Sequence, residues 1–295
     1  MSALFHAGHK QKAIEVAREI TVAFPDSPLG WLLLGAAFWN TERFDEAEAA
    51  YQEAAKIDPK HVRVLRAQAE LAELRRQYDR SEALWAQAIE YHPKQLDIRI
   101  ALADCLLLQG KREAAVSVFQ GAMEVRSPHE GEWRLLLTAL IRAEYFAMAL
   151  DACDRGIEII DHEARWIRLE KIRLLLTCKD YSFRDYPAAL EMLEPLVPRM
   201  DGYATTSDLY VLALLRNEQF DRAREAAQRA IDLSEENTRL LLWLSLIEAR
   251  TEHFDLACSY YYQAKVLLET DPQAAFLEEW VSESEALISK ACGGE

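Results

Sequence analysis

Residues 28–61 read PLGWLLLGAAFWNTERFDEAEAAYQEAAKIDPKH, and this stretch decides the fold. In its first half, large apolar residues and one glycine fall at the spacings i, i+3, i+4 and i+7, which line one face of a helix: Trp31, Leu34, Gly35 and Phe38. A similar face follows in the second half at Ala47, Tyr51 and Ala54. The stretch therefore predicts a helical hairpin in which the small Gly35 lets a neighbouring helix approach closely.

The second half of this hairpin recurs along the chain at an almost constant period. One small residue returns at intervals of 34 residues, with a single interval of 40, at Ala13, Ala47, Ser81, Ala115, Ala149, Ala189, Ala223 and Ala257. Positions three before, four after and seven after each of these residues lie on the same helical face. One hairpin cannot bury its apolar face alone, so the period predicts hairpins that stack and share a continuous core.

Composition and charge narrow the class of protein. The 295 residues include only 10 Gly and 9 Pro, which disfavours turn-rich β-sandwiches and barrels and favours an all-α fold. The net charge of −15 disfavours general nucleic-acid binding. The chain contains no apolar run long enough to span a membrane. Its first residues, MSALFHAGHKQKA, lack the pattern of a signal peptide, so we expect a cytoplasmic protein.

Residues 28–61 resemble the tetratricopeptide repeat (TPR), whose pattern is W-x2-L-G-x2-Y, then A-x3-F, then P, with a period of 34. The matching residues are Trp31, Leu34, Gly35, Phe38, Ala47, Tyr51 and Pro59. The resemblance covers about residues 8–270 and weakens toward the C-terminus, where several repeats lack the closing proline. It implies a right-handed α-solenoid of about seven to eight hairpins, with a concave groove lined by the first helices.

The repeat period divides the chain into segments. A partial repeat at 1–27 precedes seven repeats that span 28–271, and a capping helix with a frayed tail follows at 272–295. The seven repeats are 28–61, 62–95, 96–129, 130–163, 164–203, 204–237 and 238–271. The repeat at 164–203 carries a six-residue insertion near 177–187, which predicts either a longer hairpin loop or a loop that supports a partner.

Motifs for catalysis are missing from the sequence. It has no glycine-rich phosphate loop, no HExxH zinc motif and no GxSxG nucleophile elbow. His6 and His9 have helical spacing but no third ligand nearby, so an exposed pair is the simpler interpretation. We expect no enzyme activity, no cofactor and no metal. The cysteines Cys105, Cys153, Cys178, Cys258 and Cys292 are odd in number and far apart, which predicts five reduced thiols.

In TPR proteins, positions 2, 5, 9, 12 and 13 of each repeat tend to face the groove. In this sequence these positions are largely apolar and carry more basic than acidic residues, although the whole chain is acidic. The first helix near 165–179, whose register is ambiguous, is also basic. We therefore predict that the following residues bind a partner: Trp39, Arg63, Arg66, Arg134, Arg142, Arg165, Arg168, Lys171, Arg216, Arg239 and Arg250.

These residues predict a protein partner with an acidic segment or a terminal carboxylate. The alternative is that these basic residues pair with carboxylates of the second helices and are structural. The Lys/Asn/Arg clamp of chaperone-binding TPR proteins is not reproduced, because Leu32 and Ala36, and then Arg66 and Glu70, occupy the relevant positions of the first two repeats.

The leading interpretation is a non-catalytic scaffold or adaptor for protein–protein interaction. A second hypothesis, carried by the stretch from Leu4 to Gly35, is the substrate-recognition region of a larger glycosyltransferase- or sulfotransferase-like enzyme. A third, an RNA-binding helical repeat, is disfavoured by the acidic balance.

Overall fold

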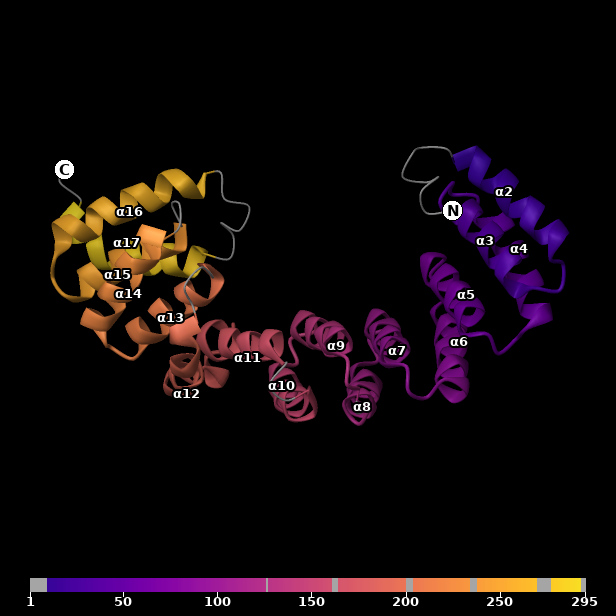
Figure 1. The fold of residues 1–295 in the computed structure, drawn as a ribbon, viewed down its shortest axis with the longest axis horizontal. Coiled ribbons are helices and arrows are strands. Elements are labelled where there is room, and N and C mark those ends of the chain that lie inside the picture. Colours follow the sequence, from indigo (N-terminus) through magenta and orange to yellow (C-terminus); the bar gives the residue numbers. More distant parts are fainter. Residues whose placement is uncertain are drawn as a thin grey trace. The chain divides into compact units, whose positions relative to one another are not determined.

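The computed structural model describes residues 10–125, 127–160, 164–199, 204–233, 238–269 and 277–292. Throughout these residues the regular structure is helical, which confirms the all-α fold. The chain forms two compact units (Figure 1). Unit 1 comprises Met1–Tyr145 with Glu158–Ile160, and unit 2 comprises Phe146–Ile157 with Asp161–Glu295.

Unit 1 is a series of antiparallel helical hairpins. Its helices are α2 (Lys10–Ala23), α3 (Pro28–Trp39), α4 (Phe44–Ile57), α5 (Val62–Leu74), α6 (Tyr78–Tyr91), α7 (Leu96–Leu108), α8 (Arg112–Met123) and α9 (Glu130–Arg142). Helix α3 packs on α4, α5 on α6 and α7 on α8, so each pair forms one hairpin. Helix α10 (Phe146–Ile160) contributes its first part to unit 2.

Unit 2 continues the same architecture and ends in one additional helix. After α10 come α11 (Arg165–Thr177), η2 (Tyr181–Phe183), α12 (Tyr186–Leu193), η3 (Glu194–Arg199), α13 (Ala204–Arg216), α14 (Phe220–Leu233), α15 (Thr238–Arg250), α16 (Phe254–Leu268) and α17 (Glu278–Cys292). The 3-10 helix η2 lies in the insertion between α11 and α12, where a longer loop was predicted.

The recurring small residue is the packing centre of the second helices. All eight members of the series, from Ala13 to Ala257, are completely buried. Four residues after three of them, the large rings of Tyr51, Trp85 and Phe119 are also buried. A larger residue at the small position would overpack the contact, which explains why the sequence keeps alanine or serine there.

Gly35 has the role predicted from the sequence. A Cβ atom added to this glycine would lie 2.2 Å from Cε1 of Tyr51, which is closer than any ordinary contact. The tyrosine ring of α4 therefore packs directly against the backbone of α3.

The prediction of five reduced thiols is wrong. Cys105, Cys153 and Cys178 are free and buried, but Cys258 on α16 is disulfide-bonded. Sequence spacing failed here because a disulfide depends on the distance between two cysteines in the fold, not on their separation along the chain.

Membrane-spanning helices and metal-binding clusters are both absent from the described part of the chain. No helix there is long and apolar enough to cross a membrane. Within the same residues, no cluster of three or more His, Cys, Asp or Glu side chains is placed to hold a metal ion.

Candidate functional site

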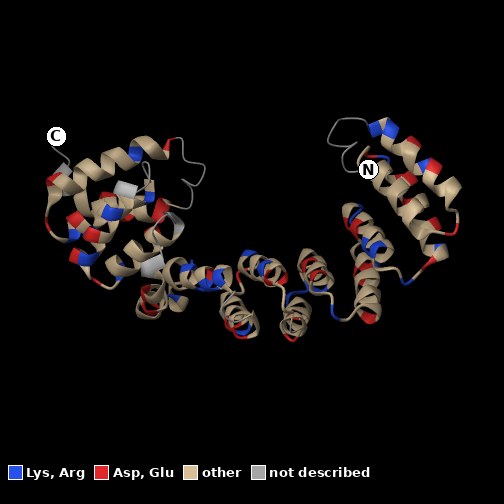
Figure 2. Ribbon diagram, viewed as in Figure 1, with Lys and Arg blue, Asp and Glu red and all other residues tan. Residues whose placement is uncertain are grey.

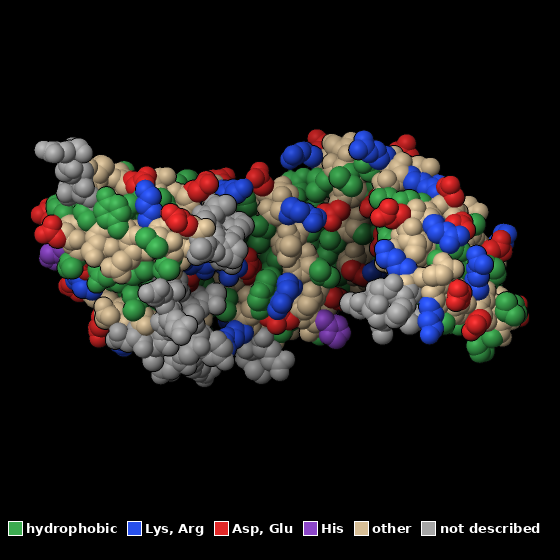
Figure 3. Space-filling model, turned by 90° about the horizontal axis from the view of Figure 1, so that it is seen from above, with side chains coloured by type: hydrophobic (Ala, Val, Ile, Leu, Met, Phe, Trp, Pro, Cys, Tyr) green, Lys and Arg blue, Asp and Glu red, His purple; other side chains and the backbone are tan. Residues whose placement is uncertain are grey.

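A pocket of about 390 Å³ opens in unit 1 between the first helices of two successive repeats. Its walls come from α3 and α5, and α4 contributes the ring of Tyr51. The lining residues are Leu29, Leu32, Leu33, Ala36, Tyr51, Arg63, Arg66, Ala67 and Glu70. We call this site the α3–α5 pocket. Figure 3 shows one face of the molecule, on which hydrophobic side chains lie exposed between charged ones.

The repeat register explains why these side chains meet. Leu29, Leu32 and Ala36 stand at positions 2, 5 and 9 of the repeat at 28–61, and Arg63, Arg66 and Glu70 stand at the same positions of the next repeat. Equivalent faces of two stacked helices thus line one pocket. Sequence reasoning missed Leu33 and Ala67, which both stand at position 6 and also line the pocket; their shared repeat position was the available signal.

Charge pairs connect first helices of neighbouring repeats at positions 5 and 2. Arg66 at position 5 pairs with Asp97 at position 2 of the following repeat. In unit 2 the two residue types exchange positions. Asp208 stands at position 5 and Arg239 at position 2 of the following repeat, and Nη1 of Arg239 lies 2.8 Å from Oδ2 of Asp208. At the α3–α5 pocket, Arg63 stands at position 2, so the matching partner would be a carboxylate at position 5 of the preceding repeat. Leu32 occupies that position instead. Among the described residues, the Arg63 guanidinium has no ion-pair or hydrogen-bond partner.

Two ionisable groups at the pocket are shifted toward their neutral forms. Burial, with a smaller effect from the charge of Glu70, raises the pKa of Tyr51 to about 12, so this phenol is protonated at neutral pH. Partial burial raises the pKa of Glu70; Arg66 opposes this shift and Glu73 adds to it. The pocket therefore offers an apolar surface, a neutral phenol ring and an exposed arginine, which together suit binding.

Sequence comparison identifies the repeat. Residues 2–62 and 211–275 match one tetratricopeptide repeat model, and residues 74–140 match another. The chain belongs to the tetratricopeptide repeat family. TPR domains are protein-interaction repeats, and this chain is a TPR scaffold of that kind. No curated protein sequence matches it.

Solved TPR structures resemble the chain at low sequence identity. A TPR protein from Parabacteroides merdae has 13% identity, with 87% of this chain and 98% of that chain covered and a TM-score of 0.47. PilF from Pseudomonas aeruginosa has 14% identity, coverage of 88% and 96%, and a TM-score of 0.41. YrrB, described as a TPR protein with an unusual peptide-binding site, has 13% identity, coverage of 78% and 97%, and a TM-score of 0.39.

Several other predicted TPR groove residues already bind carboxylates of the chain. Nη2 of Arg142 lies 2.5 Å from Oδ1 of Asp104 on α7. Lys171 on α11 pairs with Asp154 on α10, which is a second helix. The Lys171 pair is the one expected by the alternative, since its carboxylate comes from a second helix. The pairs of Arg66, Arg142 and Arg239 instead use carboxylates of neighbouring first helices.

The remaining candidates lie on the predicted helices. Trp39 is partly buried and packs edge-to-face against Phe44, with ring centroids 5.9 Å apart. Arg134 lies on α9, and Arg165 and Arg168 lie on α11. Figure 2 shows several basic residues along α11. Arg216 and Arg250, at position 13 of their repeats, both bind Glu283 of α17.

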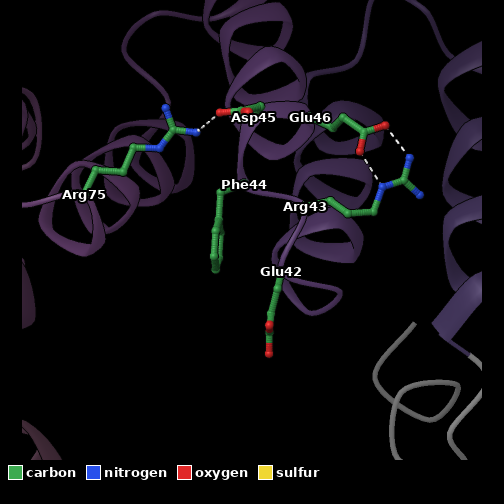
Figure 4. A pocket seen from close by; sticks show the side chains of 6 residues that line it. All are labelled: Glu42, Arg43, Phe44, Asp45, Glu46 and Arg75. Carbon is green, nitrogen blue, oxygen red and sulfur yellow. Dashed lines mark hydrogen bonds and ion pairs between the residues drawn. The ribbon is translucent and has the colours of Figure 1, made fainter.

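A second pocket, of about 350 Å³, lies at the turn between α3 and α4 (Figure 4). The charged groups that line it include two ion pairs. Arg43 pairs with Glu46, and Nη2 of Arg75 lies 2.6 Å from Oδ1 of Asp45. Arg75 also bonds Glu48, so these pairs connect α4 to the end of α5. The Arg75 pairs therefore connect two repeats, whereas the Arg43–Glu46 pair lies within one repeat at the start of α4.

Proposed function

We propose that the chain is a non-catalytic scaffold that binds a peptide segment of a partner protein in the α3–α5 pocket. One observation carries the proposal: an apolar pocket on the groove face of two repeats has at its edge an arginine, Arg63, that finds no counter-charge in the described chain.

The chemistry of the pocket indicates the kind of segment. Leu29 is about half exposed, at 46%, although it is a large apolar residue, so covering it removes apolar area from water. An arginine pairs well with a carboxylate because its planar guanidinium can donate two parallel hydrogen bonds. We therefore expect an apolar anchor side chain with a nearby Asp, Glu or terminal carboxylate.

A peptide-display selection on the purified chain tests this proposal. We expect selected peptides to share an apolar residue and an acidic residue, and to bind more weakly as the salt concentration rises. The variant Arg63→Glu should weaken their binding by about tenfold or more, which corresponds to about 1.4 kcal/mol.

The matched control is Lys94→Glu, which makes the same change in charge at an exposed residue of unit 1 outside the pocket. Its affinity for the selected peptides should equal that of the wild type. If Arg63→Glu binds them as tightly as the control does, or if no acidic–apolar motif is selected, the proposed pocket is not the binding site.

The basic residues of α9 in unit 1 and those of α11 in unit 2 are two further predicted contacts, each considered by itself. Charge reversal of Arg134 and Arg142, and separately of Arg168 and Lys171, should leave the helical circular-dichroism signal intact and weaken binding of the selected peptides. Unchanged affinity would restrict binding to the α3–α5 pocket.

A further inference from the structure

The C-terminal helix α17 does more than cover the last hairpin. It packs against α15 and α16 (Figure 1). Its first turns also reach two earlier repeats of unit 2 through two glutamates, Glu279 and Glu283. A helix that only capped the final repeat would need contacts with that repeat alone.

Three arginines from three successive repeats hold these glutamates. Arg184, in the insertion of the repeat at 164–203, donates from Nη1 and Nη2 to the two carboxylate oxygens of Glu279, both at 2.9 Å. Arg216 donates to both oxygens of Glu283 at 3.0 and 2.5 Å, and Arg250 donates to Oε1 of Glu283 at 2.9 Å. Paired hydrogen bonds of this kind are strong and directional.

An aromatic anchor lies between the two glutamates. The ring of Trp280 meets Trp243 of α15 edge-to-face, with centroids 4.9 Å apart. The guanidinium of Arg216 lies over the same ring, 4.4 Å from its centroid. Trp280 is almost completely buried, at 3% exposed. The helix thus presents the pattern Glu-Trp-x-x-Glu to a face made of arginines and one tryptophan.

The fit between α17 and this face is incomplete. Within the described part of the chain, three buried polar atoms at the contact lack a hydrogen-bond partner: Nε of Arg216, Nε1 of Trp243 and Oγ of Ser284. Buried polar groups without partners weaken a contact, because they lose water and gain nothing in return. Two of these atoms, Nε of Arg216 and Nε1 of Trp243, belong to the face, whereas Ser284 belongs to α17. A helix that keeps the charge pairs and brings an acceptor to those two atoms fits the face better.

We propose that the face formed by Arg184, Arg216, Trp243 and Arg250 recognises an acidic–aromatic helix of a partner protein, and that α17 occupies it as an internal ligand. The partner helix carries the pattern Glu-aromatic-x-x-Glu and displaces α17. This inference concerns unit 2 and is independent of the α3–α5 pocket.

A trans-binding experiment on the full-length chain tests the inference. The probe is a fluorescein-labelled peptide of residues 277–291, LEEWVSESEALISKA. The variant Glu279→Gln/Glu283→Gln weakens the internal helix but keeps Trp280 in the core. In fluorescence anisotropy, this variant should bind the peptide about tenfold more tightly than the wild type does. The buffer contains reductant, because Cys258 on the adjacent α16 is disulfide-bonded.

Two controls separate recognition from a loosened fold. Glu278→Gln/Ser282→Ala changes two exposed residues of the same helix and should bind the peptide as the wild type does. A peptide with Gln at both glutamates and Ala at Trp280 should bind neither protein. Adding Arg216→Glu and Arg250→Glu to the released variant should abolish binding of the native peptide.

Three results would overturn the inference. The first is equal affinity of the wild type and the released variant for the peptide. The second is no binding by a released variant that retains its helical circular-dichroism signal, which would make α17 a permanent cap. The third is loss of that signal in the variant, which would make α17 a part of the folding core.

Discussion

Among the residues that the structure describes, six turns that follow first helices place a residue in the left-handed backbone region. Gly110 has φ of 76°, and the other five residues have φ between 57° and 63°: Glu42, Arg76, Glu144, Glu218 and Glu252. The turns at 42, 76, 110 and 144 are spaced by 34 residues, and so are those at 218 and 252, so this is a feature of the repeat. Only glycine adopts such a conformation without strain, yet five of these turns use a larger residue.

At these turns, replacing glycine with alanine should lower the stability of the protein, and replacing a larger residue with glycine should raise it. Gly110→Ala should lower the free energy of unfolding by about 1 kcal/mol, since no atom lies near the added Cβ and only backbone strain acts. Glu218→Gly should raise it by about 0.5–1 kcal/mol, because the strain of a side chain is removed. Chemical denaturation measures both changes.

The exposed Glu218 also provides the control for this exchange. Glu218→Ala keeps a Cβ atom in the left-handed region and should leave the free energy of unfolding almost unchanged. A Glu218→Gly protein less stable than Glu218→Ala would contradict the assignment of strain.

Gly35 makes a second prediction at the residue scale. Gly35→Ala should destabilise the chain by about 1–3 kcal/mol, because the new Cβ would collide with the buried ring of Tyr51. Gly131→Ala on α9 is the control, since nothing lies within 4 Å of its added Cβ. Alanine favours helix there, so this control should match or exceed the wild type in urea denaturation. Equal midpoints for Gly35→Ala and the wild type would disprove the close contact.

At the scale of elements, the second helices and α17 are held by different forces. The second helices bury an alanine face, which is insensitive to pH. Helix α17 depends on charge. The hydrogen bond from Arg184 lowers the pKa of Glu279. Burial raises the pKa of Glu283, but the bonds from Arg216 and Arg250 outweigh it, so this pKa is also lowered.

Docking of α17 should therefore weaken in acid. A carboxylate with a lowered folded-state pKa contributes stability in full above its unfolded pKa, about 4.3, and loses it as the pH falls through the folded value. Thermal unfolding of the wild type should shift down below about pH 4, and Glu279→Gln/Glu283→Gln should shift less over the same range. Parallel pH curves for the two proteins would show that these glutamates do not hold the helix.

At the scale of the whole molecule, the number of free thiols distinguishes the sequence-based expectation, five, from the structure, in which Cys258 is disulfide-bonded. Because Cys258 is disulfide-bonded and a disulfide consumes two thiols, five cysteines leave three free groups. Titration of the denatured, unreduced protein should give three, and reduction should raise the count to five. Burial raises the pKa of Cys153 to about 12, so the denaturing step is needed to expose it. A count of five before reduction would contradict the bonded state of Cys258.

The sequence alone determines the repeat architecture of this protein and which side chains share a helical face. The 34-residue period, the buried small residues and the close approach at Gly35 could all be predicted, because helical spacing fixes which side chains share a face. The same register placed Arg63 and Arg66 on the groove face, and it placed Leu32 and Ala36 beside them. These are local properties, since one repeat and its neighbour suffice to determine them.

Only the tertiary structure decided which charges have partners. Arg66 and Arg142 stand at groove positions like Arg63, but Asp97 and Asp104 lie within reach of them. The contact of Arg184 with Glu279 joins residues 95 apart in the sequence, and no repeat pattern predicts it. The disulfide of Cys258 is of the same kind. Periodicity fixes the orientation of a side chain on its own helix, whereas an ion pair or a disulfide requires the distance between two atoms, which only the folded chain sets.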